Sequence, residues 1–220
     1  MNNRYRIWIG YSTDEAQAFD VCAKSIKRRS SVPVEIYPIR QDWLRALGLY
    51  WRERNPLAST EFSVTRFLTP CLAGYNGPAL FMDSDFLVLA DIRELFDLYD
   101  PTYAVQCVKH EYSPTAETKM GGMTQTVYPK KNWSSLMLFS SDHPDVKLLT
   151  PHKVNTETPL YLHRMQWTED GSIGSLPEEW NFLVNHTRGI EPKGLHFTEG
   201  TLIQGVRDDY SHLWEEELKA

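Results

Sequence analysis

The sequence has 220 residues, 41% of them apolar and 12% aromatic, which suffices for the core of one domain and is unlike a disordered or low-complexity chain. A formal net charge of −6 argues against a general affinity for nucleic acid or for anionic membranes. Three widely spaced cysteines suggest neither a disulfide framework nor a zinc site and fit a reducing compartment, so we expect a cytoplasmic protein. No uninterrupted apolar window approaches about 18 residues, so we expect no transmembrane segment.

The first hundred residues alternate between strand-like and helix-like patterns. Apolar residues recur at every second position in the strand-like segments and at helical spacing in the others. The predicted elements are strands over 4–10, 32–39 and 79–82 and helices over 13–29, 61–70 and 91–98. Because a strand, a helix and a second strand in this order form a right-handed crossover, we expect an α/β fold with a mainly parallel central sheet flanked by helices, in a single domain over 1–220.

The second half of the chain is less regular. Two further strands are predicted over 102–108 and 135–139. The polar, turn-rich segment between them, residues 110–132, is longer than an ordinary connection, and we interpret it as a candidate binding loop or hairpin excursion.

Two carboxylates interrupt the apolar run LFMDSDFLVL, at Asp83 and Asp85. In an extended segment, side chains at i and i+2 project to the same side, so this pair can converge on one cation while Ser84 points away. The 13 aspartates of the chain predict roughly 0.8 such pairs by chance, so a capped turn is the open alternative. Burying two unpaired carboxylates would cost several kcal/mol, and that cost favours a metal site.

Hard oxygen ligands select Mg²⁺ or Mn²⁺, ions that commonly bind the phosphates of a substrate. Open α/β sheets bind ligands at the carboxyl ends of their strands, where the first strand delivers Gly10, Tyr11 and Ser12. The ring of Tyr11 could stack on a nucleobase, although an ordinary surface tyrosine is an equally good interpretation. A diphosphate ligand is therefore expected near these two strand ends.

Several segments together resemble the retaining glycosyltransferases of the GT-A (Rossmann-like) fold that are related to glycosyltransferase family 8. The matching segments are IGYSTDEAQAFDVC, TRFLTP, MDSDFLVLADI, KNWSSLMLFS, YLHRMQW, SLPEEWNFLV and LHFTEG, in that order over most of the chain. In that family an Asp-x-Asp motif binds a divalent metal and the diphosphate of a nucleotide sugar.

The resemblance implies a metal site and a set of donor contacts. The implied ligands of Mn²⁺ or Mg²⁺ are Asp83, Asp85 and His196, although a histidine in a short apolar strand taken alone is more often structural. The implied donor contacts are Gly10, Tyr11, Ser12, Arg66, Asp83, Ser84, Asn132, Ser134, Trp180, Asn181, Thr198 and Gly200. For Trp180, packing in the core is an equally good interpretation, and Asn132 and Ser134 could equally make turn hydrogen bonds.

The chain departs from the family at two places. The terminal motif continues as HFTEGTLIQG, which places Glu199 near the expected diphosphate. The family's Asp-Gln-Asp segment corresponds here to HRMQWTEDGS, so only Gln166 matches, and the carboxylate for the sugar hydroxyls would be Glu169 or Asp170. We therefore name Gln166 and Asp170 as candidate catalytic residues; an inverting enzyme would need a carboxylate base, for which Asp170, Glu178 and Glu179 are available.

The activity that the resemblance implies is transfer of a hexose, from UDP-glucose or UDP-galactose, to the hydroxyl of a glycan or other acceptor, with retention. A non-catalytic nucleotide-sugar- or glycan-binding module of the same fold is the alternative. A haloacid-dehalogenase-type phosphatase fits less well because Leu87 stands where its motif has Thr or Val, and a nucleotide-sugar pyrophosphorylase would need a glycine-rich phosphate loop that IGYSTDE lacks.

Overall fold

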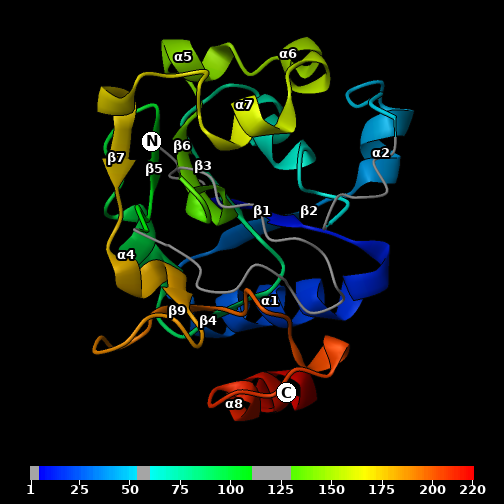
Figure 1. Ribbon diagram of the computed structural model, residues 1–220. Helices are drawn as coiled ribbons and strands as arrows, with labels where there is room; N and C mark the ends of the chain where they lie inside the picture. Colours follow the sequence, from blue (N-terminus) through cyan, green and yellow to red (C-terminus); the bar gives the residue numbers. More distant parts are fainter. Residues whose placement is uncertain (1–4, 54–59, 111–129) are drawn as a thin grey trace.

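The structure is a computed structural model that describes residues 5–53, 60–110 and 130–220 (Figure 1). A six-stranded sheet in the order β2-β1-β3-β6-β5-β7 forms its centre. The strands are β1 (Tyr5–Gly10), β2 (Val34–Ile39), β3 (Pro78–Met82), β5 (Val105–Cys107), β6 (Leu136–Ser140) and β7 (Ile173–Ser175). Strand β1 is parallel to both β2 and β3, and β5 is parallel to β7, whereas β6 is antiparallel to its two neighbours. The prediction of an α/β fold with a mainly parallel sheet is confirmed.

A second sheet of three short strands lies beside the carboxyl end of β3. It has the order β4-β9-β8 and consists of β4 (Phe86–Val88), β8 (Phe182–Leu183) and β9 (Gly194–His196). Strands β4 and β9 are antiparallel, with Phe86 directly opposite His196. This pairing joins the segment after the aspartate pair to the C-terminal part of the chain.

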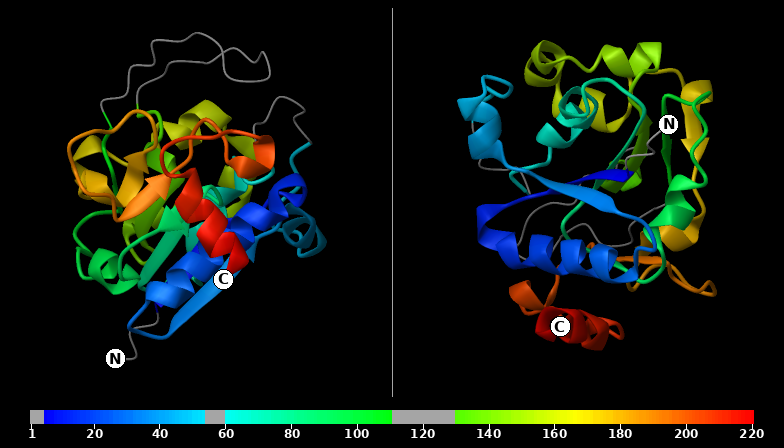
Figure 2. Two further views of the ribbon diagram at one scale, coloured as in Figure 1. Left: turned by 90° about the horizontal axis from the view of Figure 1, so that it is seen from below. Right: turned by 180° about the vertical axis from the view of Figure 1, so that it is seen from behind.

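Helices cover both faces of the central sheet (Figures 1 and 2). The α-helices are α1 (Ala16–Arg29), α2 (Gln41–Ala46), α3 (Thr69–Leu72), α4 (Ile92–Phe96), α5 (Pro144–Lys147), α6 (Pro151–Thr156), α7 (Pro159–His163) and α8 (Ser211–Lys219). The 3₁₀ turns are η1 (Thr13–Glu15), η2 (Thr65–Leu68), η3 (Trp133–Ser135), η4 (Asp170–Ser172), η5 (Glu178–Asn181) and η6 (Leu202–Gln204). Helix α1 and the small sheet lie on one face, with α8 packed outside α1, while α5 to α7 lie on the other face (Figure 1). Among the described residues, no helix is long and apolar enough to cross a membrane.

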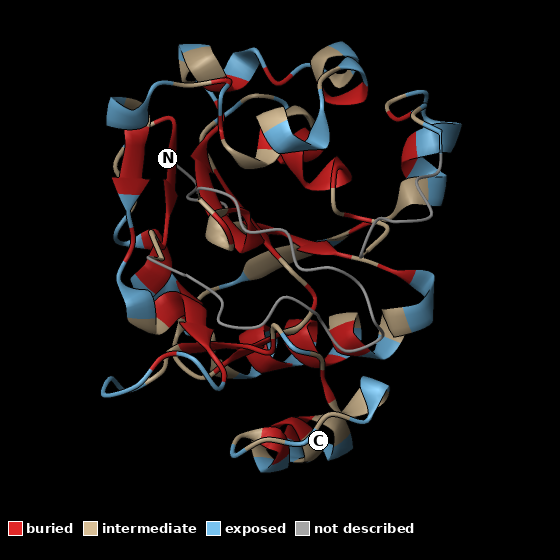
Figure 3. Cartoon of the chain, viewed as in Figure 1, coloured by how far each residue is buried: buried red, intermediate tan, exposed pale blue. Residues whose placement is uncertain are grey.

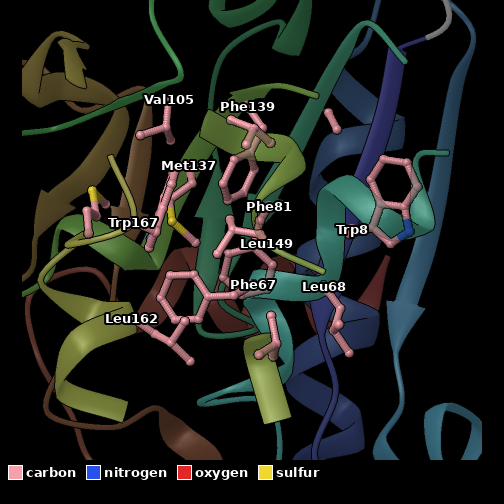
Figure 4. Close-up of a cluster of buried hydrophobic side chains, with 14 of the residues drawn as sticks. Trp8, Phe67, Leu68, Phe81, Val105, Met137, Phe139, Leu149, Leu162 and Trp167 are labelled. Carbon is pink, nitrogen blue, oxygen red and sulfur yellow. The ribbon is translucent and has the colours of Figure 1, made fainter. Parts of the chain in front are cut away.

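The core is divided between the two faces of the sheet. On the face of α5 to α7, a cluster that includes Phe67, Phe81, Met137 and Phe139 is fully buried (Figure 4). On the opposite face, residues of β1, β3 and β6 pack against α1 and α4. Figure 3 shows β3 and β6 as largely buried, whereas the edge strand β2 is mostly intermediate. Burial of this apolar area fixes the carboxyl ends of β1 and β3 side by side.

Two sequence-based predictions differ from the structure or lie outside it. The helix predicted over 61–70 is wrong, because a turn and the 3₁₀ segment η2 occupy these residues and α3 begins only at Thr69. Pro70 has no N–H to donate to the carbonyl of Arg66, and the Thr69 hydroxyl donates to that oxygen instead, at 2.8 Å. Of the candidate binding loop over 110–132, residues 111–129 lie outside the described residues.

Candidate functional site

Asp83, Asp85 and His196 lie together at the carboxyl end of β3. One ligand-type atom from each residue lies within 4.8 Å of the others, and this is the one such group of three among the residues that the structure describes. Asp83 directly follows β3, and Ser84 and Asp85 form a turn that leads into β4, which is the turn that the sequence left open as an alternative to an extended segment. The pairing of β4 with β9 places His196 opposite Phe86, the residue after Asp85. The geometry therefore unites the three residues named as metal ligands.

Arg66 is the cation nearest to Asp83. Its Nη1 atom lies 2.8 Å from Asp83 Oδ1 and donates to the Ser134 carbonyl oxygen, also at 2.8 Å. Arg66 is 6% exposed, and its guanidinium lies against the rings of Phe62 and Phe81. Burial raises the pKa of Asp83 to about 7; the charge of Arg66 opposes this shift and the charge of Asp85 adds to it.

The site contains more acceptor oxygen than the protein satisfies. Among the described residues, Oδ1 of Asp83 pairs with Nη1 of Arg66, whereas Oδ1 of Asp85 is buried without a hydrogen-bond partner and lies 3.5 Å from Nε2 of His196. The hydroxyls of Ser84 and Thr198, their neighbours in sequence or across the small sheet, are also buried without a partner. Because buried polar atoms are nearly always paired, this concentration of buried oxygen atoms beside two carboxylates fits a cation-binding site. Two carboxylates and one imidazole suit Mn²⁺ or Mg²⁺.

The ring of His196 is held on two sides. It stacks on Phe86 with ring centroids 4.4 Å apart, and its Nδ1 atom lies 2.8 Å from Asn181 Oδ1. Its Nε2 atom lies 3.5 Å from Asp85 Oδ1. Asn181 is fully buried, and its side chain contacts the candidate metal ligand His196 directly.

The segment Gly10, Tyr11 and Ser12 lies at the neighbouring strand end. A Cβ atom on Gly10 would lie 2.4 Å from the ring of Phe62, so only glycine fits there. The hydroxyl of Ser12 accepts a hydrogen bond from the Glu61 amide at 3.1 Å. The Tyr11 ring is half-buried, with the guanidinium of Arg40 5.0 Å from its centroid.

The three other predicted donor residues before β9 are largely engaged within the protein. The Asn132 carbonyl oxygen accepts from Ser135 Oγ at 2.6 Å, and Ser134 Oγ lies 2.8 Å from Nδ1 of His163. The Trp180 ring is 1% exposed and packs in the core beside α1, which is the structural interpretation left open by the sequence.

Residues after β9 form a turn beside the metal ligands. Gly200 has a φ of +118°, a conformation that favours glycine, and Thr198 is half-buried. Glu199 is exposed and engaged by its neighbours, accepting from Asn185 Nδ2 at 3.1 Å and lying 3.1 Å from His186 Nε2. These contacts hold its carboxylate toward the turn at Asn185.

The candidate catalytic residues are not part of the triad. Gln166 is exposed on the turn after α7, and Asp170 is exposed and pairs with Lys130 at 2.5 Å. That hydrogen bond lowers the pKa of Asp170. Glu178 accepts from Thr187 Oγ1 at 3.0 Å, and Glu179 lies 3.8 Å from Lys193 Nζ. No described contact joins any of these four to the metal ligands.

Two histidines at the site were not singled out by the sequence. Burial, followed by the charge of His196, lowers the pKa of His110 to about 4, while contact with Asn181 opposes the shift. Burial, followed by the charge of Arg66, lowers the pKa of His163 to about 3. Both rings are therefore neutral near pH 7, and no local pattern distinguishes them from structural histidines.

Comparisons with known proteins agree with this architecture. The chain resembles the glycosyltransferase GlyE of Streptococcus pneumoniae TIGR4 with a TM-score of 0.62 at 15% identity, covering 100% of this chain and 61% of that one. It resembles the galactosyltransferase LgtC, solved with donor and acceptor sugar analogs, with a TM-score of 0.63 at 13% identity, covering 97% of this chain and 95% of that one. At these identities the likeness establishes the fold, that of the GT-A glycosyltransferases.

A sequence relative is much closer in identity than these structures. No protein-family model matches the chain. The chain is 52% identical over 223 residues to Protein CDI of Arabidopsis thaliana, covering 98% of this chain and 86% of that protein. The chain therefore belongs to the family of Protein CDI, and it has the GT-A fold.

Proposed function

We propose that the protein is a metal-dependent glycosyltransferase that moves a hexose from a nucleotide sugar to an acceptor hydroxyl. The proposed donor is UDP-glucose or UDP-galactose. The observation that carries the proposal is the group of Asp83, Asp85 and His196 at a strand end, where the buried Oδ1 of Asp85 has no hydrogen-bond partner among the described residues. The GT-A fold supports it, because GlyE and LgtC, which share this fold, are glycosyltransferases.

The donor would lie across the ends of β1 and β3. Gly10 lets the backbone pass close to the Phe62 ring, and Tyr11 offers an aromatic surface for the base. Asp83 and Asp85, with His196, would hold a divalent ion and through it the two phosphates. Arg66 keeps Asp83 in place and supplies positive charge beside the phosphates.

A bound divalent ion would supply Lewis-acid stabilisation of the charge on the leaving nucleoside diphosphate. In the retaining version of the reaction, the side chain of Gln166 faces the anomeric carbon and Asp170 binds sugar hydroxyls. Both side chains are exposed, so they are available to substrate, although Asp170 must exchange its contact with Lys130 for a sugar hydroxyl. Asn132, Ser134 and the turn with Thr198 and Gly200 complete the proposed donor pocket.

The test is release of nucleoside diphosphate from a panel of nucleotide sugars with Mn²⁺ or Mg²⁺, with and without acceptor sugars. We expect release that requires the metal and is abolished by Asp85→Ala. The matched control is Asp97→Asn, which changes an exposed aspartate that pairs with Arg93 at 3.5 Å on the surface and should leave release unchanged.

Full activity of the Asp85→Ala protein would refute the assignment. Binding of nucleotide sugars without release, with every acceptor in the panel, would favour a non-catalytic binding module. The anomeric configuration of the product, read by NMR, decides between retention and inversion.

A further inference from the structure

A chain of hydrogen bonds runs from the proposed metal ligand His196 into the protein. His196 Nδ1 lies 2.8 Å from Asn181 Oδ1, and Asn181 Nδ2 lies 2.9 Å from Ser135 Oγ and 3.4 Å from the Asn132 carbonyl oxygen. Ser135 Oγ in turn donates to the same Asn132 oxygen at 2.6 Å. The residues come from η5, η3 and β9, so the contacts exist only in the folded chain.

The direction of these bonds follows from what each atom can donate. A carbonyl oxygen accepts only, and the hydroxyl of Ser135 uses its one hydrogen on the Asn132 oxygen, so toward Asn181 it also accepts. The Asn181 atom that faces both acceptors must therefore be its NH₂ group. Its oxygen is then the atom that faces His196, and the hydrogen between Asn181 and His196 must be carried by Nδ1 of the histidine.

This proton assignment determines which histidine nitrogen can bind a metal. A neutral imidazole with its hydrogen on Nδ1 has its lone pair on Nε2, which lies 3.5 Å from Asp85 Oδ1. Two acceptor atoms thus face one another, an arrangement that a cation between them would satisfy. The Phe86 ring, stacked at 4.4 Å, prevents the imidazole from turning out of this plane.

We propose that Asn181 is a positioning residue that fixes His196 in the Nδ1–H form and so makes Nε2 a metal ligand. Ser135 and the Asn132 carbonyl in turn fix the orientation of the Asn181 amide by accepting hydrogen bonds from its NH₂ group. Loss of such an outer partner typically weakens metal binding about 10- to 100-fold. This inference rests on the metal site of the proposed function and on no step of sugar transfer.

The test measures Mn²⁺ affinity without any nucleotide sugar, by the EPR signal of free Mn²⁺. We expect Asn181→Ala to weaken binding about 10- to 100-fold, and Ser135→Ala to weaken it about fivefold, the worth of one hydrogen bond. The matched control is Asn155→Ala, which removes another buried asparagine with four hydrogen bonds outside the site and should leave Mn²⁺ affinity unchanged.

Two further readouts separate positioning from a general loss of structure. The double variant Asn181→Ala/His196→Ala should bind Mn²⁺ as weakly as His196→Ala alone, because Asn181 acts through that ring; an additional loss would overturn the inference. In ¹⁵N-histidine NMR spectra of the metal-free protein, the signal that His196→Ala removes should report a hydrogen on Nδ1, and a hydrogen on Nε2 would also overturn it.

The outcomes distinguish this inference from the proposed function. If His196→Ala binds Mn²⁺ as the wild type does, the metal site itself is wrong and the inference falls with it. If His196→Ala weakens binding while Asn181→Ala does not, only the role of Asn181 is refuted.

Discussion

Replacing Arg66 with methionine tests the electrostatics of the site in the metal-free protein. Methionine keeps an unbranched apolar side chain against the Phe62 and Phe81 rings but removes the cation that lies 2.8 Å from Asp83 Oδ1. Removing one partner of a buried ion pair costs about 3–5 kcal/mol. For a chain of this size that loss lowers the Tm by roughly 6–20 °C.

The loss of stability caused by Arg66→Met should be larger at high pH than at low pH. The pKa of Asp83 in the folded chain is about 7, above its ordinary value. The folded chain therefore binds a proton at this carboxyl more tightly than the unfolded chain, and the stability that this proton contributes is present in acid and is lost as the pH rises through 7. At about pH 5.5 the carboxyl is already protonated in the wild type. The attraction to Arg66 then contributes little, and Arg66→Met should cost much less than at about pH 8.

The assay is urea unfolding in EDTA at both pH values, with two comparison proteins. Adding Asp83→Asn to Arg66→Met removes the orphaned charge and should recover most of the stability at about pH 8. Arg93→Met removes a surface cation that is 55% exposed and should change stability by less than about 0.5 kcal/mol. The reasoning fails if Arg66→Met is as stable as Arg93→Met at the higher pH, or if the double variant recovers nothing.

Three further predictions use other parts of the structure. Gly194→Ala places a Cβ atom 2.6 Å from a carbonyl oxygen of η5 and should lower the free energy of unfolding in urea by about 1–3 kcal/mol. The control Gly171→Ala meets nothing within 4 Å and should leave stability unchanged, so equal losses in the two variants would contradict this reasoning. Asn155→Ala leaves four backbone groups of 49–52 and α6 unpaired, costs about 2–4 kcal/mol, and should speed amide exchange there first. Mn²⁺ at about 100 times its Kd should raise the Tm by roughly 5–10 °C, but not in Asp85→Asn; an equal rise in both would exclude this site.

Much of the fold could be predicted because local periodicity reflects backbone geometry. The alternation in β1 and β2 and the helical spacing in α1 are properties of a few consecutive residues, and the structure has these elements close to the predicted bounds. The wrong helix over 61–70 shows the limit of that signal, since Pro70 breaks an otherwise apolar helical pattern. The strands of the small sheet are two or three residues long, too short for any period to be read.

The candidate site likewise has one part that local sequence predicts and another that depends on tertiary contacts. The sequence by itself determined that two carboxylates stand close together directly after a buried strand. The extended segment predicted for them is wrong, because Ser84 and Asp85 form a turn between β3 and β4. Only the tertiary structure decided that Nε2 of His196 lies beside Asp85 and that Asn181 contacts Nδ1 of the same ring, because these contacts depend on how β9 and η5 pack against β4. Residues distant in the chain meet through burial of apolar surface, which no local pattern encodes.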